Sequence, residues 1–375
     1  MEKLVLGIIG IFFVISGFDY INNNNKLGLG DKFKDGMISM GSIAISMVGI
    51  YSLSPLIGEG IGFLLTPISN FIGIDSSIFP SMFLAVDMGA LGIAESLSSN
   101  IHMYWISGVI IASTLGATIS FSIPLALGII EEKYLEDLTT GLLYGIMTLP
   151  IAPIVAGLFL GVDIKLLLFN IFPLIIFAIL LAVFMNRFKD TTVKFFIKLG
   201  KLIQLVSILG LLVLGFLSIL GIKPIGSILS IDEALSVVGK IAIFLGGAYP
   251  LINFITEKFS KVLSKIGEKI NIDEFSIAAF LGTLASNIIL FQSFNKMSSK
   301  GRIALTAFSV SGAFVIGGQL GFVSLKTPEI INIYIASKLI AGITAMVLAL
   351  IVHRKTEENL NDESQSEENI PVLES

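Results

Sequence analysis

The sequence contains no cysteine, only two histidines (His102 and His353) and a single tryptophan. The absence of cysteine excludes disulfide bonds, iron–sulfur clusters and thiolate metal sites. Two histidines so far apart do not form a metal site of the usual type, so neither a metal nor a cofactor is expected. Phosphate-binding loops, catalytic triads and metal-ligand spacings are also missing, so nothing in the sequence supports an enzyme or a nucleic-acid partner.

Charge is scarce as well. Only 14% of the 375 residues are charged and 54% are hydrophobic, whereas soluble domains carry about 25% charged residues. Apolar segments of about 20 residues, each long enough to cross ~30 Å of hydrocarbon, recur along the chain. The sequence therefore predicts an all-α polytopic membrane protein. These segments are roughly 4–21, 36–57, 79–98, 104–128, 138–160, 165–185, 202–221, 233–255, 276–294, 302–324 and 331–352.

The chain also contains an internal repeat. The segment "GSIAISMVGIY" (41–51) matches "GKIAIFLGGAY" (239–249) at an offset of 198, and "FLAVDMGA" (83–90) matches "FLGTLASN" (280–287) at 197. Two shorter pairs, 116–119 with 312–315 and 144–148 with 341–345, have nearly the same offset. Duplicated halves are common in secondary transporters.

The distribution of Lys and Arg favours one topology. If 79–98 and 276–294 are re-entrant hairpins, each half has four spans plus a hairpin, and one span at 165–185 connects two inverted repeats. The N-terminus then lies outside and the C-terminus inside, with 18 basic residues in inside loops and 4 outside, as the positive-inside rule requires. The alternative is eleven plain transmembrane helices, because hairpins and spans look alike in hydropathy.

This topology predicts four parts of the chain. They are a first repeat (1–163), a connecting span with a basic cytoplasmic loop (164–200), a second repeat (201–353) and an acidic tail (354–375) that is disordered by composition.

Asp87, Met88 and Gly89 fall at the tip of the first predicted hairpin. Gly89 suits a turn that needs an unusual φ. An ionised carboxylate at this depth costs about 2.5–3.5 kcal/mol on insertion scales, a cost that a bound cation offsets. We therefore expect Asp87 to bind a small ammonium group, with Met88 as an apolar contact. The alternative is a wetted carboxylate near the interface or one paired with a lysine; Lys338 is available inside a span, although such lysines more often snorkel.

Ser286 and Asn287 fall at the matching tip of the second hairpin. Thr118 and Gln319 lie in the next repeat-related pair, 113–124 and 309–322, where small residues beside glycine suit an unwound helix. An acid opposite amides and hydroxyls fits a ligand with one cationic end and one hydroxyl end. Ordinary turn chemistry and close helix packing are the alternatives.

Four stretches carry a family resemblance. "GLGDKFKDGMISMGSIAISMVGIYSLSP" (28–55), "MFLAVDMGALGIAESL" (82–97), "SFSIPLALGIIE" (120–131) and "AGITAMVLALIV" (341–352) resemble the ethanolamine-utilisation transport protein (EutH) family. The resemblance implies a multi-pass protein of the bacterial cytoplasmic membrane that imports ethanolamine for a lyase-containing microcompartment. It also strengthens the assignment of Asp87, Met88 and Gly89.

The chain departs from the family pattern at two places. Gly318-Gln319 stands where the family has Asp-His, and 286–289 reads "SNII" where it has Asn-Asn-Ile-Pro. The expected function is import of ethanolamine or a closely related small amine, with the cargo, the coupling ion and homo-oligomerisation left open. The alternative is an amine-binding membrane receptor or assembly subunit that transports nothing.

Overall fold

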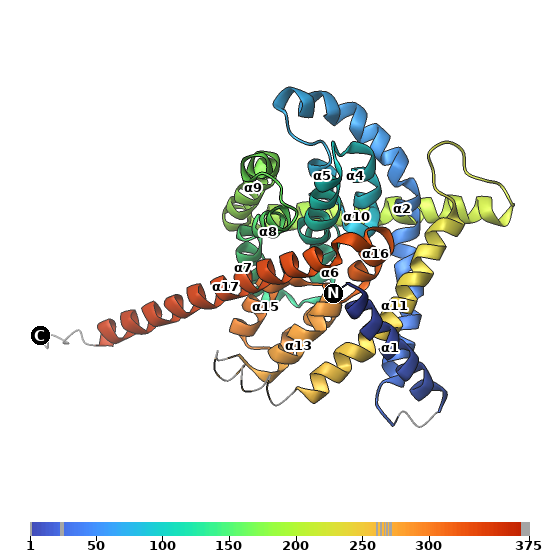
Figure 1. Cartoon of the computed structure of the whole chain (residues 1–375). Helices are drawn as coiled ribbons and strands as arrows, with labels where there is room; N and C mark the ends of the chain where they lie inside the picture. The colour runs from blue at the N-terminus through green and yellow to red at the C-terminus, as the bar shows by residue number, and fades with distance from the viewer. Residues whose placement is uncertain are drawn as a thin grey trace, which may run out of the picture.

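The computed structural model describes residues 2–22, 26–259 and 272–368, together with residues 262, 265, 267 and 269. These residues form helices joined by turns, and no strand occurs among them (Figure 1). The prediction of an all-α chain is confirmed. In lipid an α-helix satisfies its own backbone hydrogen bonds, so apolar runs of this length adopt it.

Eight helical segments among the described residues are long and apolar enough to cross a membrane, which fits a polytopic membrane protein. Two of these eight segments are built from more than one helix. The helices of these eight segments are α1 (Glu2–Ile21), α2 (Gly30–Ile72), α5 (Ile101–Trp105) to α6 (Ile123–Ile129), α7 (Leu135–Met147) with α8 (Ile151–Phe159), α9 (Ile164–Arg187), α10 (Lys189–Ile219), α11 (Ile231–Lys258) and α17 (Ile331–Glu368).

The alternative of eleven plain transmembrane helices is wrong, because segment 138–160 is divided into α7 and α8 and three further apolar segments are broken. Segment 302–324 consists of α15 (Ser299–Gly312) and α16 (Gly318–Lys326), separated by non-helical residues. Segment 79–98 contains α3 (Ile78–Ser81), the π-helix η1 (Val86–Ala90) and α4 (Leu91–Leu97). Segment 276–294 contains α13 (Glu274–Ala285) and α14 (Asn287–Ser293).

Segment 79–98 forms a hairpin, so that the chain returns to the point at which the segment starts. Asp75 Oδ2 accepts hydrogen bonds from the backbone N and the Oγ of Ser99, at 2.7 and 2.6 Å. Asp75 Oδ1 accepts from the backbone N of Ser77 at 3.0 Å. One carboxylate therefore holds both ends of a helical hairpin together.

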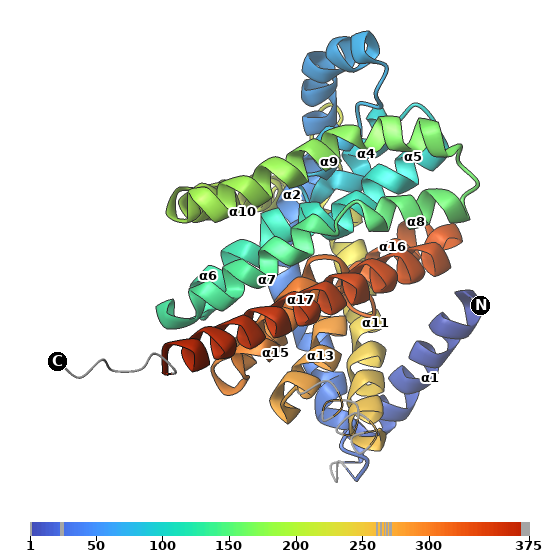
Figure 2. The ribbon, with the colours of Figure 1, turned by 90° about the vertical axis from the view of Figure 1, so that its left-hand side faces the viewer.

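Segment 276–294 is closed in the same way by Asp273, which lies 198 residues after Asp75 in the chain. Asp273 Oδ2 accepts from the Oγ atoms of Ser276 and Ser298, both at 2.6 Å, and from the backbone N of Ser298 at 2.9 Å. In both views α4 and α5 lie near the end of α2, whereas α13 and α15 lie near its beginning (Figures 1 and 2). The first hairpin thus lies toward the end of α2 and the second toward its beginning.

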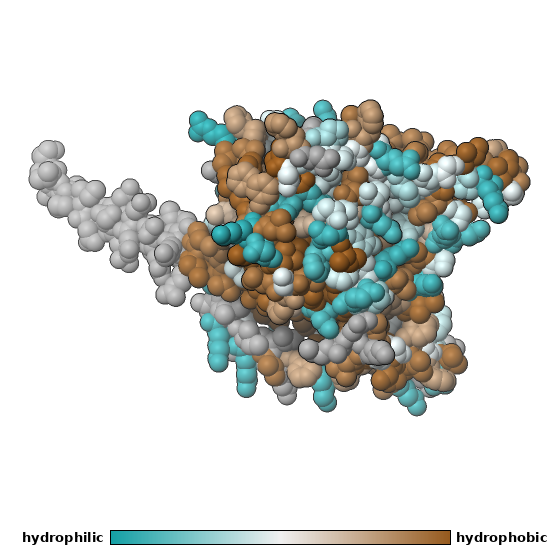
Figure 3. Space-filling view, turned by 45° about the horizontal axis from the view of Figure 1, so that its top comes forward, coloured by the Kyte–Doolittle hydropathy of each residue, from teal (hydrophilic) through white to brown (hydrophobic). Residues whose placement is uncertain are grey.

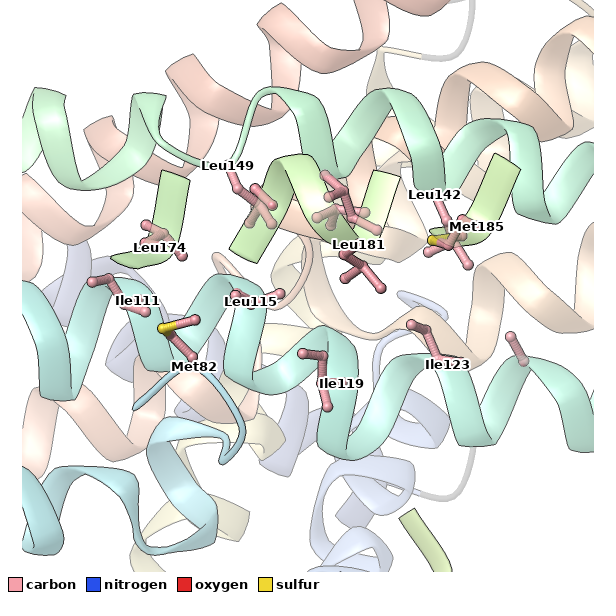
Figure 4. Packing of buried hydrophobic residues seen from close by; sticks show 14 of the residues in the cluster. Met82, Ile111, Leu115, Ile119, Ile123, Leu142, Leu149, Leu174, Leu181 and Met185 are labelled. Carbon is pink, nitrogen blue, oxygen red and sulfur yellow. The ribbon is translucent and has the colours of Figure 1, made fainter. Parts of the chain in front are cut away.

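The largest apolar core lies between the hairpins and the middle helices. Leu115, Ile119 and Ile123 face Leu142, Leu181 and their neighbours on α7 and α9 (Figure 4). The segment 113–124 does not unwind as predicted. It continues as the π-helices η2 (Ile106–Gly116) and η3 (Thr118–Ser122), whose wider turn keeps the backbone hydrogen-bonded.

The face shown in Figure 3 carries large apolar areas, with hydrophilic residues between them. Along α10, Leu212, Phe216 and Ile219 are 63%, 63% and 85% exposed. A soluble protein would bury such side chains, whereas a bilayer solvates them.

The helix α17 extends through residues 354–368, the first part of the acidic tail that composition predicts to be disordered. Residues 369–375 of that tail lie outside the described residues.

Candidate functional site

A cavity of about 330 Å³ lies where the two hairpin tips meet α2, α11 and the break between α15 and α16. Its wall is largely apolar with a few polar groups, the usual character of a small-molecule site. Of the predicted site residues, Asp87, Met88, Ser286 and Gln319 line this cavity. These residues therefore converge on one space from three distant parts of the chain.

The first hairpin tip turns its carboxylate into this cavity. Gly89 adopts φ +99°, a conformation in which a residue with a Cβ is strained. Ala85 N donates to Ser120 Oγ at 3.1 Å, which anchors the extended residue before the tip. The Asp87 side chain is partly exposed to the cavity. Among the described residues, its own backbone amide is the only hydrogen-bond donor close to the carboxylate.

The opposite wall is an interrupted helix, as the sequence predicts for 309–322. Phe314 lines the cavity with φ 61°, a left-handed conformation that is rare for a bulky residue. Its backbone groups are satisfied by neighbours: Phe314 N donates to Thr283 O, and Tyr334 OH donates to Phe314 O, both at 3.1 Å. Non-helical backbone persists at this depth only with such partners.

Glycine is required where this break approaches the second hairpin. A Cβ at Gly317 would lie 2.0 Å from Ala285 O. Ile316 N donates to Leu284 O at 2.9 Å, next to this contact. The second tip and the break therefore form one rigid wall, with Ser286 facing the cavity.

Gln319 joins the cavity to a buried lysine. Lys338 on α17 is 0% exposed, so it does not snorkel. Its Nζ donates to Ser113 O and, at 3.3 Å, to Gln319 Oε1. The same Nζ lies 5.3 Å from the ring centroid of Tyr334. Lys338 and Asp87 attract one another electrostatically, yet no ion pair within 4.0 Å among the described residues includes either group.

Thr118 and Asn287 are not among the residues that line the cavity. Thr118 Oγ1 donates to Thr114 O, one turn back in the same helical segment, at 2.8 Å and to Val310 O on α15 at 3.2 Å. Asn287 is fully buried, and its Nδ2 donates to Ser122 Oγ at 2.7 Å. Their hydrogen bonds hold helices together, so contact with a ligand stays a prediction for these two residues.

A second cavity, of about 520 Å³, adjoins the first. The two share Tyr249, Ala285, Ser286 and Ile288 as lining residues. The second cavity also reaches Lys32 and Asp35, near the beginning of α2. We call this second cavity the vestibule, because it lies between the Asp87 cavity and that end of the molecule.

Sequence reasoning missed several cavity residues. Ser39, Ser42 and Ser46 line the cavity from α2, and their spacing of three and four residues is a helical signal that the sequence contains. Tyr249 was detectable as the repeat counterpart of Tyr51. No local pattern indicates that Phe314 adopts a left-handed backbone, because that depends on partners in α13 and α17.

The comparison with known proteins covers nearly the whole chain. The family model for "Ethanolamine utilisation protein, EutH" matches residues 1–352. The chain is 34% identical over 350 residues to the "Probable ethanolamine permease EutH" of Listeria monocytogenes, covering 93% of this chain and 94% of that protein. It is also 34% identical over 352 residues to the protein of that name in Escherichia coli, covering 87% and 86%.

A third relative, from Bacillus subtilis, is named "Uncharacterized protein YxeR" and is 34% identical over 349 residues, covering 93% of this chain and 94% of that protein. No solved structure matches the chain. Matches at this identity, in order and over almost the full length, define membership of a family of membrane permeases. The chain therefore belongs to the EutH family of ethanolamine utilisation proteins.

Proposed function

We propose that this protein imports ethanolamine, or a closely related small amine, across the bacterial cytoplasmic membrane, and that the substrate ammonium binds Asp87. The observation that carries this proposal is a carboxylate that faces a cavity and lacks a donor from any other described residue. An ionised acid at membrane depth is destabilising by itself. A small cation in the cavity would remove that cost.

The rest of the cavity suits a short amino alcohol. Gln319 and Ser286 offer polar groups for the hydroxyl, and Met88, Phe121 and Phe314 provide apolar contact. Ethanolamine has four non-hydrogen atoms. The space of about 330 Å³ would hold it together with several waters, at about 30 Å³ each.

The size of the substrate limits its affinity. The best small ligands gain about 1.5 kcal/mol per non-hydrogen atom, or about 6 kcal/mol for four atoms. That corresponds to a Kd no tighter than tens of micromolar. We therefore expect saturation in the range from tens of micromolar to millimolar.

The repeat suggests how the substrate crosses. We place the two halves, 1–163 and 201–353, in inverted orientation, with the hairpins entering from opposite sides. The matched closures at Asp75 and Asp273, 198 residues apart, support this arrangement. Substrate sites at the interface of inverted repeats are typical of secondary transporters.

Tyr249 and Tyr51, also 198 residues apart, are candidates for paired gates. Tyr249 lies between the cavity and the vestibule, where it is half-buried. Tyr51 is 5% exposed and packs edge-on against Phe322, with ring centroids 5.9 Å apart. The cavity is therefore accessible on the Tyr249 side and closed on the Tyr51 side. Transport would require Tyr249 to close its side and Tyr51 to open the other.

We assign the vestibule side to the cytoplasm because Lys26, Lys32 and Lys34, before and in the first turns of α2, lie there, and the basic residues gather on the same side in the predicted topology. The N-terminus then lies outside and the C-terminus inside.

The test is uptake of labelled ethanolamine into proteoliposomes containing the full chain, with Asp87→Asn as the variant. Loss of a charge partner inside a protein costs about 2 kcal/mol or more, so uptake should fall at least ~30-fold while membrane insertion is unchanged. Glu95→Gln is the matched control, because Glu95 lies in the same hairpin and is exposed.

Uptake that survives in Asp87→Asn would remove Asp87 from the site. Saturable binding of ethanolamine without any uptake by the unmodified protein would instead identify an amine-binding receptor or assembly subunit.

A further inference from the structure

Lys338 is a fully buried amine in the transmembrane core that the proposed transport step does not use. The groups in contact with it are neutral: the carbonyl of Ser113, the side-chain oxygen of Gln319 and the ring face of Tyr334. Asp87 attracts it without forming an ion pair within 4.0 Å. A buried lysine without a paired acid is costly and needs such acceptors. The position therefore calls for a role beyond packing.

The contact with Gln319 fixes which end of that amide faces the cavity. An amide has one oxygen that accepts and one nitrogen that donates, whereas a lysine ammonium only donates. Since Gln319 Oε1 accepts from Lys338, Nε2 is the group left for the cavity that Gln319 lines. The cavity thus presents a carboxylate acceptor at Asp87 and an amide donor at Gln319.

We infer that Lys338 is a specificity-determining residue, which orients Gln319 so that the site takes a ligand with an ammonium at one end and a hydrogen-bond acceptor at the other. This inference rests on the proposed function. A hydroxyl oxygen accepts from Nε2. A second ammonium group cannot accept a hydrogen bond, so it would leave Gln319 Nε2 unpaired. The positive charge of Lys338 would also repel it, so the site disfavours a diamine.

The test compares two ligands of equal length, 3-aminopropan-1-ol and 1,3-diaminopropane, as inhibitors of labelled ethanolamine uptake into proteoliposomes. The amino alcohol should inhibit the unmodified protein at least ~10-fold more strongly than the diamine, because one like-charge contact weakens binding by about tenfold or more. In Lys338→Met this preference should shrink by about tenfold. The matched control is Lys240→Met, which changes an exposed lysine inside α11 and should keep the preference.

Gln319→Glu gives a second reading and covers a loss of folding in Lys338→Met. It keeps a partner for Lys338 and replaces the donor by a carboxylate, so the preference should shift toward the diamine by about tenfold or more.

An unchanged ligand preference in Gln319→Glu, or in a folded Lys338→Met, overturns the inference while leaving ethanolamine transport intact. If the unmodified protein neither binds nor takes up ethanolamine, the proposed function fails first and the inference fails with it.

Discussion

Gly89 controls the direction in which the Asp87 carboxylate points. Its φ of +99° turns the chain between the extended Ala85 and the helix α4. A Cβ there would lie 3.1 Å from Ser54 Cβ and 3.3 Å from Ile50 O. Both the backbone conformation and the close approach to α2 therefore require glycine.

We expect Gly89→Ala to reduce ethanolamine uptake at least ~5-fold, because a left-handed backbone costs a residue with a Cβ about 1–2 kcal/mol and the tip would shift to relieve it. The measurement is initial uptake rate together with the melting temperature in detergent. Gly215→Ala is the control, since a Cβ at Gly215 has no atom within 4 Å. Equal rates for both variants would show that the tip geometry does not position Asp87.

The hairpins are the elements that distinguish this fold from a simple bundle, and each depends on one aspartate at its base. Burial by itself would raise the pKa of Asp273, but hydrogen bonds from Ser276 and Ser298 lower it to about 2, below the ordinary value of 3.8. The ionised form therefore closes the hairpin.

This closure predicts a pH dependence. A carboxyl group whose pKa is lower in the folded state stabilises the protein above its unfolded pKa, and that contribution is lost as the pH falls through the folded pKa. Asp273→Asn should therefore lower the melting temperature at about pH 5–7, and the difference should disappear as the pH falls from about 4 to 2.

Asp232→Asn is the control for this comparison, because Asp232 is an exposed residue in the first turn of α11. A difference between Asp273→Asn and the unmodified protein that stays constant down to about pH 2 would show that the charge of Asp273 does not hold the hairpin.

At the scale of the whole molecule, the two cavities adjoin one another, and the second reaches Lys32 and Asp35 near the beginning of α2. Tyr249 lies between them, and its repeat counterpart Tyr51 is buried against Phe322. The absence of cysteine makes this asymmetry testable, since any introduced cysteine is the single thiol of the chain.

We expect Ser42→Cys, in the wall of the Asp87 cavity, to react with a membrane-impermeant cationic thiol reagent in inside-out vesicles and not in right-side-out ones. Saturating ethanolamine should slow the reaction several-fold by occupying the cavity. Lys223→Cys, in the loop predicted to lie outside, should show the opposite sidedness. Reaction of Ser42→Cys from the outer face alone would reverse the proposed orientation.

Composition and periodicity sufficed for the broad architecture. Apolar segments predicted the spans, and the offset of 197–198 placed "DMGA" (87–90) opposite "LASN" (284–287), which the structure finds at two matching helix breaks. These features are local, because the number and spacing of apolar residues decide whether a segment enters lipid.

The tertiary structure alone decided which polar groups share the cavity. Thr118 and Asn287 bond to neighbouring helices, whereas Gln319 faces the cavity and accepts a hydrogen bond from Lys338, a lysine of a kind that more often snorkels to an interface. The sequence determined that polar groups would be carried into the membrane. Their orientation depends on partners more than 150 residues away in the chain, and no local pattern contains that information.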